Sequence, residues 1–272
     1  MNRSELGVAL RALRVSSGKE AKVVARSAVM SPSKLSKIET GKLTPSADDV
    51  DRILTALEVS AAVKAEYLDA ARAVATEATA WRLIQRAGLH KAQERLRAIE
   101  ARMSLLRVFQ PALVPGLLQT PEYARAILAR HDDLTEETVR RTVAARLERQ
   151  AVLYDESKTF RFVITEPVLR WLIVPPMVMV GQLDKLISVT RLPNVDLRVV
   201  PLVGPKRDIP NHAFVIRDDR AVTVETVHAE VVVTDPRDVA TYVAKFDDFA
   251  EDAVVGTGTI GLLEGIRDEL LR

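Results

Sequence analysis

Four short polar or basic side chains fall on the outer face of one predicted helix near the N-terminus. They are Ser31, Ser33, Lys34 and Lys37, and they alternate with the apolar residues Leu35 and Ile38. A helix that enters the major groove of DNA needs short hydrogen-bonding or basic side chains on the face it presents to the bases. The pattern therefore predicts that these four side chains contact base edges, while the two apolar residues point into a core.

A second set of cations surrounds this helix. We expect Lys22, Arg26 and Lys42 to neutralise phosphates rather than to read bases. The backbone N–H groups at the start of the helix provide a further phosphate contact. Residues 1–42 carry nine Lys or Arg against three acids, a net +6, and the other residues sum to −4. A basic head on an acidic body is typical of nucleic-acid binding, although a solvated basic surface gives the same count.

Short helices must hold these side chains in place. Apolar spacing predicts helices from Leu6 to the region of Gly18, over 21–28, from Ser31-Pro32 to Gly41, and from Ser46 onward. Ser31 and Ser46 are the expected N-caps of the last two helices. Four or five such helices in residues 1–60 predict a small all-α bundle with a helix-turn-helix.

The stretch VARSAVMSPSKLSKIETGKLTPS over residues 24–46 resembles the xenobiotic-response-element type of helix-turn-helix. The resemblance implies DNA binding and an internal ion pair for Glu39. Two positions depart from the pattern. Ala21 replaces a glutamine that contacts DNA in many members, and Val29 replaces the glycine of the turn, where a branched side chain resists a left-handed backbone. We expect the fold to survive both changes, while sequence preference does not carry over.

The rest of the chain changes character twice. Residues 61–110 are rich in Ala, Arg and Glu and predict a helical connector, with helices over 61–87 and 91–108. Residues 111–272 predict an α+β domain with a mostly antiparallel sheet. Its expected strands are 160–165, 195–201, 213–217, 222–227 and 230–234, with a turn at Asp218-Asp219, and its expected helices are 121–129, 135–154, 177–190, 236–252 and 260–271. The fold class is therefore multidomain.

The run Leu113 to Arg125, which contains VPGLLQT and Tyr123-Ala124, is similar to the second domain of WhiJ-like regulators of actinobacteria. Further matches are the run 145–150, Glu166 with Leu169-Arg170, Gln182 with Leu183 and Leu186, and Glu225. The resemblance implies a transcriptional regulator whose C-terminal domain has no settled activity. It also implies a small partner protein as a binder.

The C-terminal residues offer little chemistry of their own. Glu166 and Arg170 favour an ion pair over acid–base catalysis. The four histidines are scattered, and His228 with Glu230 lacks a third metal ligand. The run 256–261 lacks the lysine of a phosphate loop and predicts a helix-capping turn. Trp171 beside Pro175-Pro176 indicates core packing or an effector pocket. We expect no catalytic set, no cofactor and no metal, and therefore no enzyme.

The absence of cysteine, of a signal peptide and of a long apolar run predicts a cytoplasmic protein without a membrane segment. The leading hypothesis is a regulator that binds double-stranded DNA as a homodimer on a near-palindromic site. Its C-terminal domain would supply dimerisation and would sense a small-molecule effector or a partner protein. The alternative is an antitoxin-like interaction protein that sequesters a small partner protein.

Overall fold

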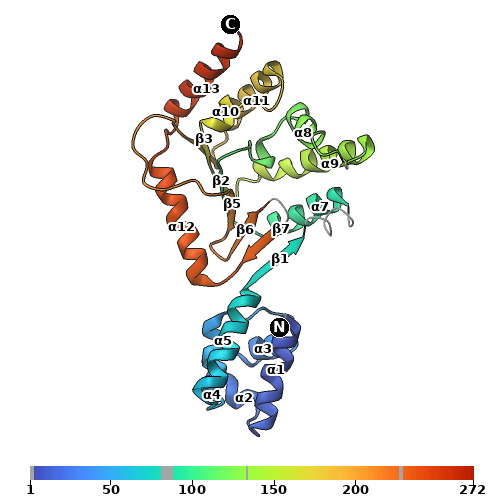
Figure 1. Cartoon of the computed structure of the whole chain (residues 1–272), viewed down its shortest axis with the longest axis vertical. Coiled ribbons are helices and arrows are strands. Elements are labelled where there is room, and N and C mark those ends of the chain that lie inside the picture. Colours follow the sequence, from blue (N-terminus) through green and yellow to red (C-terminus); the bar gives the residue numbers. More distant parts are fainter. Residues whose placement is uncertain (1–2, 81–87, 133, 227–228) are drawn as a thin grey trace. The chain divides into compact units, whose positions relative to one another are not determined.

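The computed structural model describes residues 3–80, 88–132, 134–226 and 229–272. By internal contacts these divide into two compact units, residues 1–78 with 231–239 and residues 79–230 with 240–272. The first unit begins with five α-helices, coloured blue to cyan in Figure 1. They are α1 (Arg3–Ser16), α2 (Ala21–Ser27), α3 (Pro32–Glu39), α4 (Ala47–Ala56) and α5 (Ala61–Ala75).

The helices of the first unit enclose one apolar core. Its buried members come from the spacing expected of amphipathic helices: Leu6, Leu10, Val24, Ala25, Leu35, Ile38, Val50, Ile53 and Leu54. Both predicted caps are confirmed. The hydroxyl of Ser31 accepts from the Lys34 N–H, and Ser46 forms a capping box with Asp49. The predicted all-α bundle is therefore what positions the helix-turn-helix.

Two glycines let α1 cross the end of α3 at close range. A Cβ on Gly7 would lie 2.4 Å from the backbone oxygen of Ile38. Gly41, just after α3, has a φ of +66°, and a Cβ there would lie 3.0 Å from the Cα of Ser4. Neither position has room for a side chain, so the exit of α3 is fixed against α1.

The second unit is built on a mixed, mostly antiparallel sheet, as predicted. Among the described residues the strand order is β1-β7-β6-β5-β2-β3-β4, in which β1 (Thr76–Ala80) is the edge strand next to β7. Strand β2 pairs in parallel with β3 and antiparallel with β5. The strands are β2 (Leu105–Gln110), β3 (Thr159–Thr165), β4 (Val195–Val200), β5 (Phe214–Arg217), β6 (Ala221–Glu225) and β7 (Ala229–Val233).

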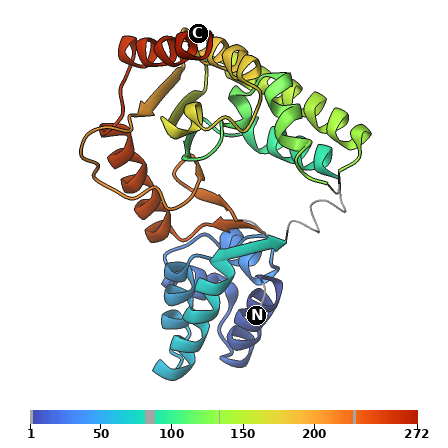
Figure 2. The same cartoon turned by 45° about the horizontal axis from the view of Figure 1, so that its top comes forward.

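Helices cover both faces of this sheet. Figure 1 shows α12 (Pro236–Glu251) on one side, where Phe249 stacks on Phe109 at 4.0 Å between ring centroids. Figure 2 shows α11 and α13 side by side. On the face opposite α12 the apolar core includes Leu106, Val108, Phe160 and Leu183. Its helices are α7 (Leu89–Glu100), η1 (Gly116–Leu118), α8 (Pro121–Leu128), α9 (Glu136–Arg149), η2 (Gln150–Tyr154), α10 (Pro167–Arg170), α11 (Pro176–Val189) and α13 (Thr257–Leu270).

Two expected helices of the connector are shorter than predicted. Helix α5 ends at Ala75, so the helix expected over 61–87 is wrong beyond that point, and residues 81–87 lie outside the described residues. Helix α7 ends at Glu100, and the residues expected to continue it form β2. The sequence LLRVFQ of β2 lies at the centre of the sheet with both faces covered. Such a strand shows no clear alternation and is easily read as helix.

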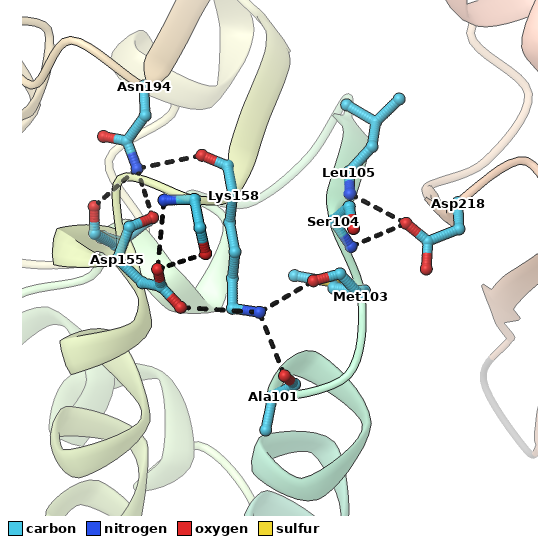
Figure 3. Close-up of polar contacts among 10 residues, drawn as sticks. Ala101, Met103, Ser104, Leu105, Asp155, Lys158, Asn194 and Asp218 are labelled. Carbon is cyan, nitrogen blue, oxygen red and sulfur yellow. Dashed lines mark hydrogen bonds and ion pairs between the residues drawn. The ribbon is translucent and has the colours of Figure 1, made fainter.

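Polar contacts fix the start of β2, as Figure 3 shows. The buried ammonium group of Lys158 donates to the carbonyls of Ala101 and Met103, at 3.1 and 2.8 Å. The carboxylate of Asp218 accepts from the N–H groups of Ser104 and Leu105. The predicted hairpin turn at Asp218-Asp219 is confirmed, because both residues have a φ of +50° between β5 and β6.

Candidate nucleic-acid interface and signature loop

Helices α2 and α3 are joined by a turn in which one residue must adopt the left-handed backbone conformation. Val29 has a φ of +53°, and the N–H of Met30 bonds to the carbonyl of Ala25 across the turn. The chain therefore adopts the turn despite the branched side chain, which is 77% exposed and packs on little. As expected, the fold survives the loss of the glycine, and the left-handed backbone of a β-branched residue leaves local strain.

Besides Ser31, which is exposed at the start of α3, the outer face of this helix carries two predicted residues and one residue that the prediction did not include. Ser33 and Lys37 are exposed, as predicted, and Ser36 is exposed between them. Positions 33, 36 and 37 are spaced by three and four residues, so they share one face of the helix. That spacing was present in the sequence and was the signal that could have added Ser36 to the predicted set.

Lys34 lies to one side of this face. Its ammonium group is 2.6 Å from a carboxylate oxygen of Asp49, the residue that completes the capping box of α4. Position 34 is one residue from the centre of the exposed face, about 100° around the helix, and so it turns toward α4. The hydroxyl oxygen of Ser31 is likewise engaged as the cap of α3. Both side chains hold α3 in its place.

The three predicted phosphate ligands are all exposed. Lys22 and Arg26 lie four residues apart on α2, and Lys42 follows α3. Within the part of the chain that the structure describes, none of the three, nor Lys37, is within ion-pair distance of a carboxylate. No carboxylate of the described residues therefore neutralises these cations.

Behind α3 the predicted internal ion pair of Glu39 is confirmed, and its partner is Arg14. The guanidinium donates two hydrogen bonds, 2.6 and 2.9 Å long, to the two carboxylate oxygens. Glu39 is 7% exposed, so the contact lies mostly out of water. Hydrogen bonding to Glu39 raises the pKa of Arg14 above its usual value. The pair ties α1 to the end of α3 and completes a rigid frame behind the exposed face.

The VPGLLQT segment forms a loop whose backbone is satisfied by buried amide side chains. Gln182 of α11 accepts from the Thr120 N–H and donates to the Leu118 carbonyl, both at 2.8 Å. Gln150 donates to the carbonyls of Gly116 and Gln119. A loop buried this way needs such partners, since the single 3-10 turn η1 leaves most of its backbone groups without an internal hydrogen bond. The signature thus encodes a structural element of the second unit.

Two side chains that we singled out in the sequence also have defined places in the second unit. The predicted ion pair of Glu166 with Arg170 is confirmed at 2.5 Å. Trp171, expected in the core or in an effector pocket, is 75% exposed instead and lies just after the end of α10 at Arg170.

The described residues contain no group of three metal-ligating side chains, and His228 lies outside them. In the same residues no helix has the length and apolar character needed to span a bilayer. The run at 256–261 caps and begins α13, as predicted.

Comparison with protein families gives two matches. A model described as a helix-turn-helix domain matches residues 5–67, the region of α1 to α5. A model described as a domain of unknown function (DUF5753) matches residues 93–265, which include the signature loop and most of the sheet. A search of curated proteins found no significant match. The two family models together cover both units.

Several solved structures are similar to parts of the chain. TrmBL2, described as an archaeal chromatin protein with a novel mode of DNA binding, is 14% identical, with 75% of this chain covered and a TM-score of 0.34. The chain spans 65% of the length of that protein. Nuc, a phospholipase D family member from Salmonella typhimurium, is 10% identical, with 66% and 97% of the two chains covered and a TM-score of 0.35. A phosphatidylserine synthase from Haemophilus influenzae Rd KW20 is 13% identical, with 66% and 42% covered and a TM-score of 0.34.

Proposed function

Because the chain belongs to the DUF5753 family and begins with a helix-turn-helix domain, we propose that it is a sequence-specific, DNA-binding regulator of transcription. The observation that carries the proposal is the exposed face of α3, flanked by cations without carboxylate partners among the described residues. A helix-turn-helix places its second helix in the major groove and uses flanking groups to grip the backbone. Residues 5–67 contain every part that this docking requires.

In this docking Ser33, Ser36 and Lys37 reach base edges. Lys22, Arg26 and Lys42 contact phosphates on either side, and each contact releases counterions and makes binding dependent on salt. Lys34 joins the base contacts by exchanging Asp49 for an acceptor on a base. Ser31 keeps its hydroxyl oxygen on the cap and offers its hydroxyl hydrogen to the DNA.

We further propose that the regulator acts in the cytoplasm as a homodimer on a near-palindromic operator. The second unit provides the dimer contacts and the response to an effector. The VPGLLQT loop and the residues around it support a WhiJ-like regulator of the actinobacterial kind. We assign no catalytic activity to the chain.

A second role, capture of a small partner protein, is favoured by exposed apolar side chains. Trp171, Leu172 and Met177 are 75%, 42% and 65% exposed around the start of α11. Exposed aromatic and methionine side chains are typical of binding surfaces. Co-purification of the full chain with the product of a short neighbouring gene, lost in Trp171→Ala, would support this role. Isolation of the chain alone from its own cells would argue against it.

The regulator proposal is tested by the affinity of the full chain for its own promoter region and for random duplex DNA. Between 50 and 200 mM salt we expect a preference of about 10³ or more for the promoter, and a steep loss of affinity with salt. The double variant Lys22→Ala and Arg26→Ala should weaken binding to both DNAs and reduce the salt slope by about 2. The matched control is Arg140→Ala with Arg141→Ala on α9, where both side chains are exposed. Equal affinity for promoter and random DNA would sink the proposal.

A further inference from the structure

Three arginines of the second unit converge beside the signature loop. Arg146 and Arg149 come from α9, and Arg217 comes from β5. A Cβ on Gly116 would lie 3.3 Å from a terminal nitrogen of Arg149 and 3.9 Å from the Nε of Arg146. The loop therefore passes directly over two of the guanidinium groups.

The sheet register places Arg217 on the face opposite α12. Arg217 is opposite Leu106 of β2, and Leu106 belongs to the core on that face. Thr223 of β6 lies on the same face and accepts a 2.7 Å hydrogen bond from Arg217. Glu225 is two residues further along β6 and so shares that face. This face of the sheet therefore carries an apolar side chain on β2 and charged side chains on β5 and β6.

The three guanidinium groups are unevenly paired. Arg149 lies 3.3 Å from Glu100 and donates to Gln93 at 2.8 Å. Arg146 donates to the neutral amide of Gln119, and Arg217 to the neutral hydroxyl of Thr223. Among the described residues, neither Arg146 nor Arg217 has a carboxylate within ion-pair distance. Two partly buried positive charges thus have only neutral hydrogen-bond partners.

Among the described residues, the buried Nε atoms of Arg146 and Arg217 have no hydrogen-bond partner, and the buried Nε of Arg149 has only its 3.3 Å ion pair with Glu100. Burial, together with repulsion from Arg149, lowers the pKa of Arg146 to about 10 even though Glu225 opposes this change. The carboxylates that act on the group are Glu100, Glu225 and Glu230, and Glu230 is also 4.0 Å from Arg95. A buried charge is costly unless it is paired and hydrogen-bonded, so an oxyanion that accepted hydrogen bonds from these guanidinium groups would be favoured at this position.

We propose that Arg146, Arg149 and Arg217 form a binding site for the oxyanion of a small molecule, a phosphate or carboxylate group that completes their hydrogen bonds. Guanidinium groups match such oxygens with paired N–H donors. Glu225 shares the sheet face of Arg217 and acts electrostatically on all three arginines, so it competes with the ligand for them. The binding site itself does not depend on the proposed regulatory function. The inference rests on that function only where it takes the bound oxyanion as the class of effector that the second unit senses.

The test is the melting temperature of the full chain without DNA, in inorganic phosphate, in succinate and in chloride at equal ionic strength. At ten times its dissociation constant, a bound anion should raise the melting temperature by about 3 °C. Phosphate also stabilises proteins by exclusion from their surface, and this part is measured with Arg140→Met, an exposed arginine on the same helix. Whichever of phosphate and succinate gives the larger specific increment identifies the ligand class.

The variant Arg146→Met should lose the specific increment while keeping a ligand-free melting temperature within a few degrees of the wild type. Glu225→Gln should bind the favoured anion several-fold more tightly, since the competing charge is gone, and it keeps the test valid if Arg146→Met does not fold. No specific increment in the wild type, the same increment in Arg146→Met, or no gain in Glu225→Gln would overturn the site. Because DNA is absent, such a failure leaves the proposed DNA binding untouched.

Discussion

Arg14 in the first unit and Arg146 in the second are both largely shielded from water, but they differ in the charge of their hydrogen-bond partners. Arg14 makes two hydrogen bonds to the carboxylate of Glu39. Arg146 makes its hydrogen bond to the neutral side chain of Gln119. Arg14 is paired with a carboxylate of its own unit, whereas no carboxylate of the described residues is within ion-pair distance of Arg146.

The same division separates the cations within the first unit. Arg14 and Lys34 contact Glu39 and Asp49 and join helices of the bundle, and Lys19 contacts Glu58 and joins the segment after α1 to the segment after α4. Lys22, Arg26, Lys37 and Lys42 have no such contact in the described part of the chain and are exposed. Paired cations therefore hold the fold, while the others are available to a ligand. In the first unit the available cations lie on the surface, as a DNA polymer requires, and in the second they are buried, as a small ligand requires.

The largest effect is expected at Gln182, whose side chain satisfies two buried backbone groups in the second unit. Gln182→Leu leaves the Thr120 N–H and the Leu118 carbonyl buried without partners and should lower the free energy of unfolding by about 3 kcal/mol. Urea unfolding of the full chain, with hydrogen exchange resolved by segment, measures the loss in the second unit. Ser188→Ala, an exposed change on the same helix, is the control and should have little effect. A loss below 1 kcal/mol would mean that water replaces both hydrogen bonds.

The direct test of the comparison sets Arg14→Met against Arg146→Met. Removing Arg14 leaves the buried carboxylate of Glu39 unpaired and should destabilise the first unit by about 2 kcal/mol. Removing Arg146 leaves only an amide without its donor and should cost less than half as much. Segment-resolved hydrogen exchange at increasing urea gives both values from full-length proteins. Equal losses would show that Arg146 is as well neutralised as Arg14, and the comparison would fail.

Lys37 and Lys34 repeat the comparison on one helix. Lys37→Ala should weaken promoter binding about tenfold, about 1.4 kcal/mol, with no change in stability, because its side chain is exposed and unpaired among the described residues. Lys34→Ala should lower stability by about 0.5 kcal/mol through the loss of its pair with Asp49, which is partly exposed. Fluorescence anisotropy and urea unfolding on the same preparations separate the two effects. A larger stability loss for Lys37→Ala than for Lys34→Ala would reverse the assignment.

Local rules predicted the parts of this molecule that local chemistry decides. The caps at Ser31 and Ser46 and the turn at Asp218-Asp219 depend on a few neighbouring residues, and all three are confirmed. Glu39 was assigned an internal ion pair through the family resemblance, but its partner is 25 residues away and had no sequence signal.

Long-range contacts account for what the sequence did not predict. The sequence of β2 suggests a continuation of α7, but this segment forms a strand because β3 and β5 pair with its two edges. The sequence predicts that Lys34 faces outward, but α4 places Asp49 beside it and the two side chains pair. The three arginines come from positions 146, 149 and 217, and only the register of β5 against β2 brings Arg217 to the face where α9 supplies the other two. Each of these depends on strand or helix partners that no spacing encodes.

A small stabilising effect is expected in the turn between α2 and α3, where the side chain of Val29 and its backbone conformation are in conflict. Val29 holds a left-handed φ that costs a β-branched residue more than it costs glycine. Val29→Gly should therefore raise the free energy of unfolding of the first unit by about 1 kcal/mol, since little packing is lost from an exposed side chain. Val29→Ala keeps the Cβ and should recover less than half of this gain. If both variants lower stability, then Val29 contributes packing that outweighs its backbone strain, and the first unit has no conflict left at this turn.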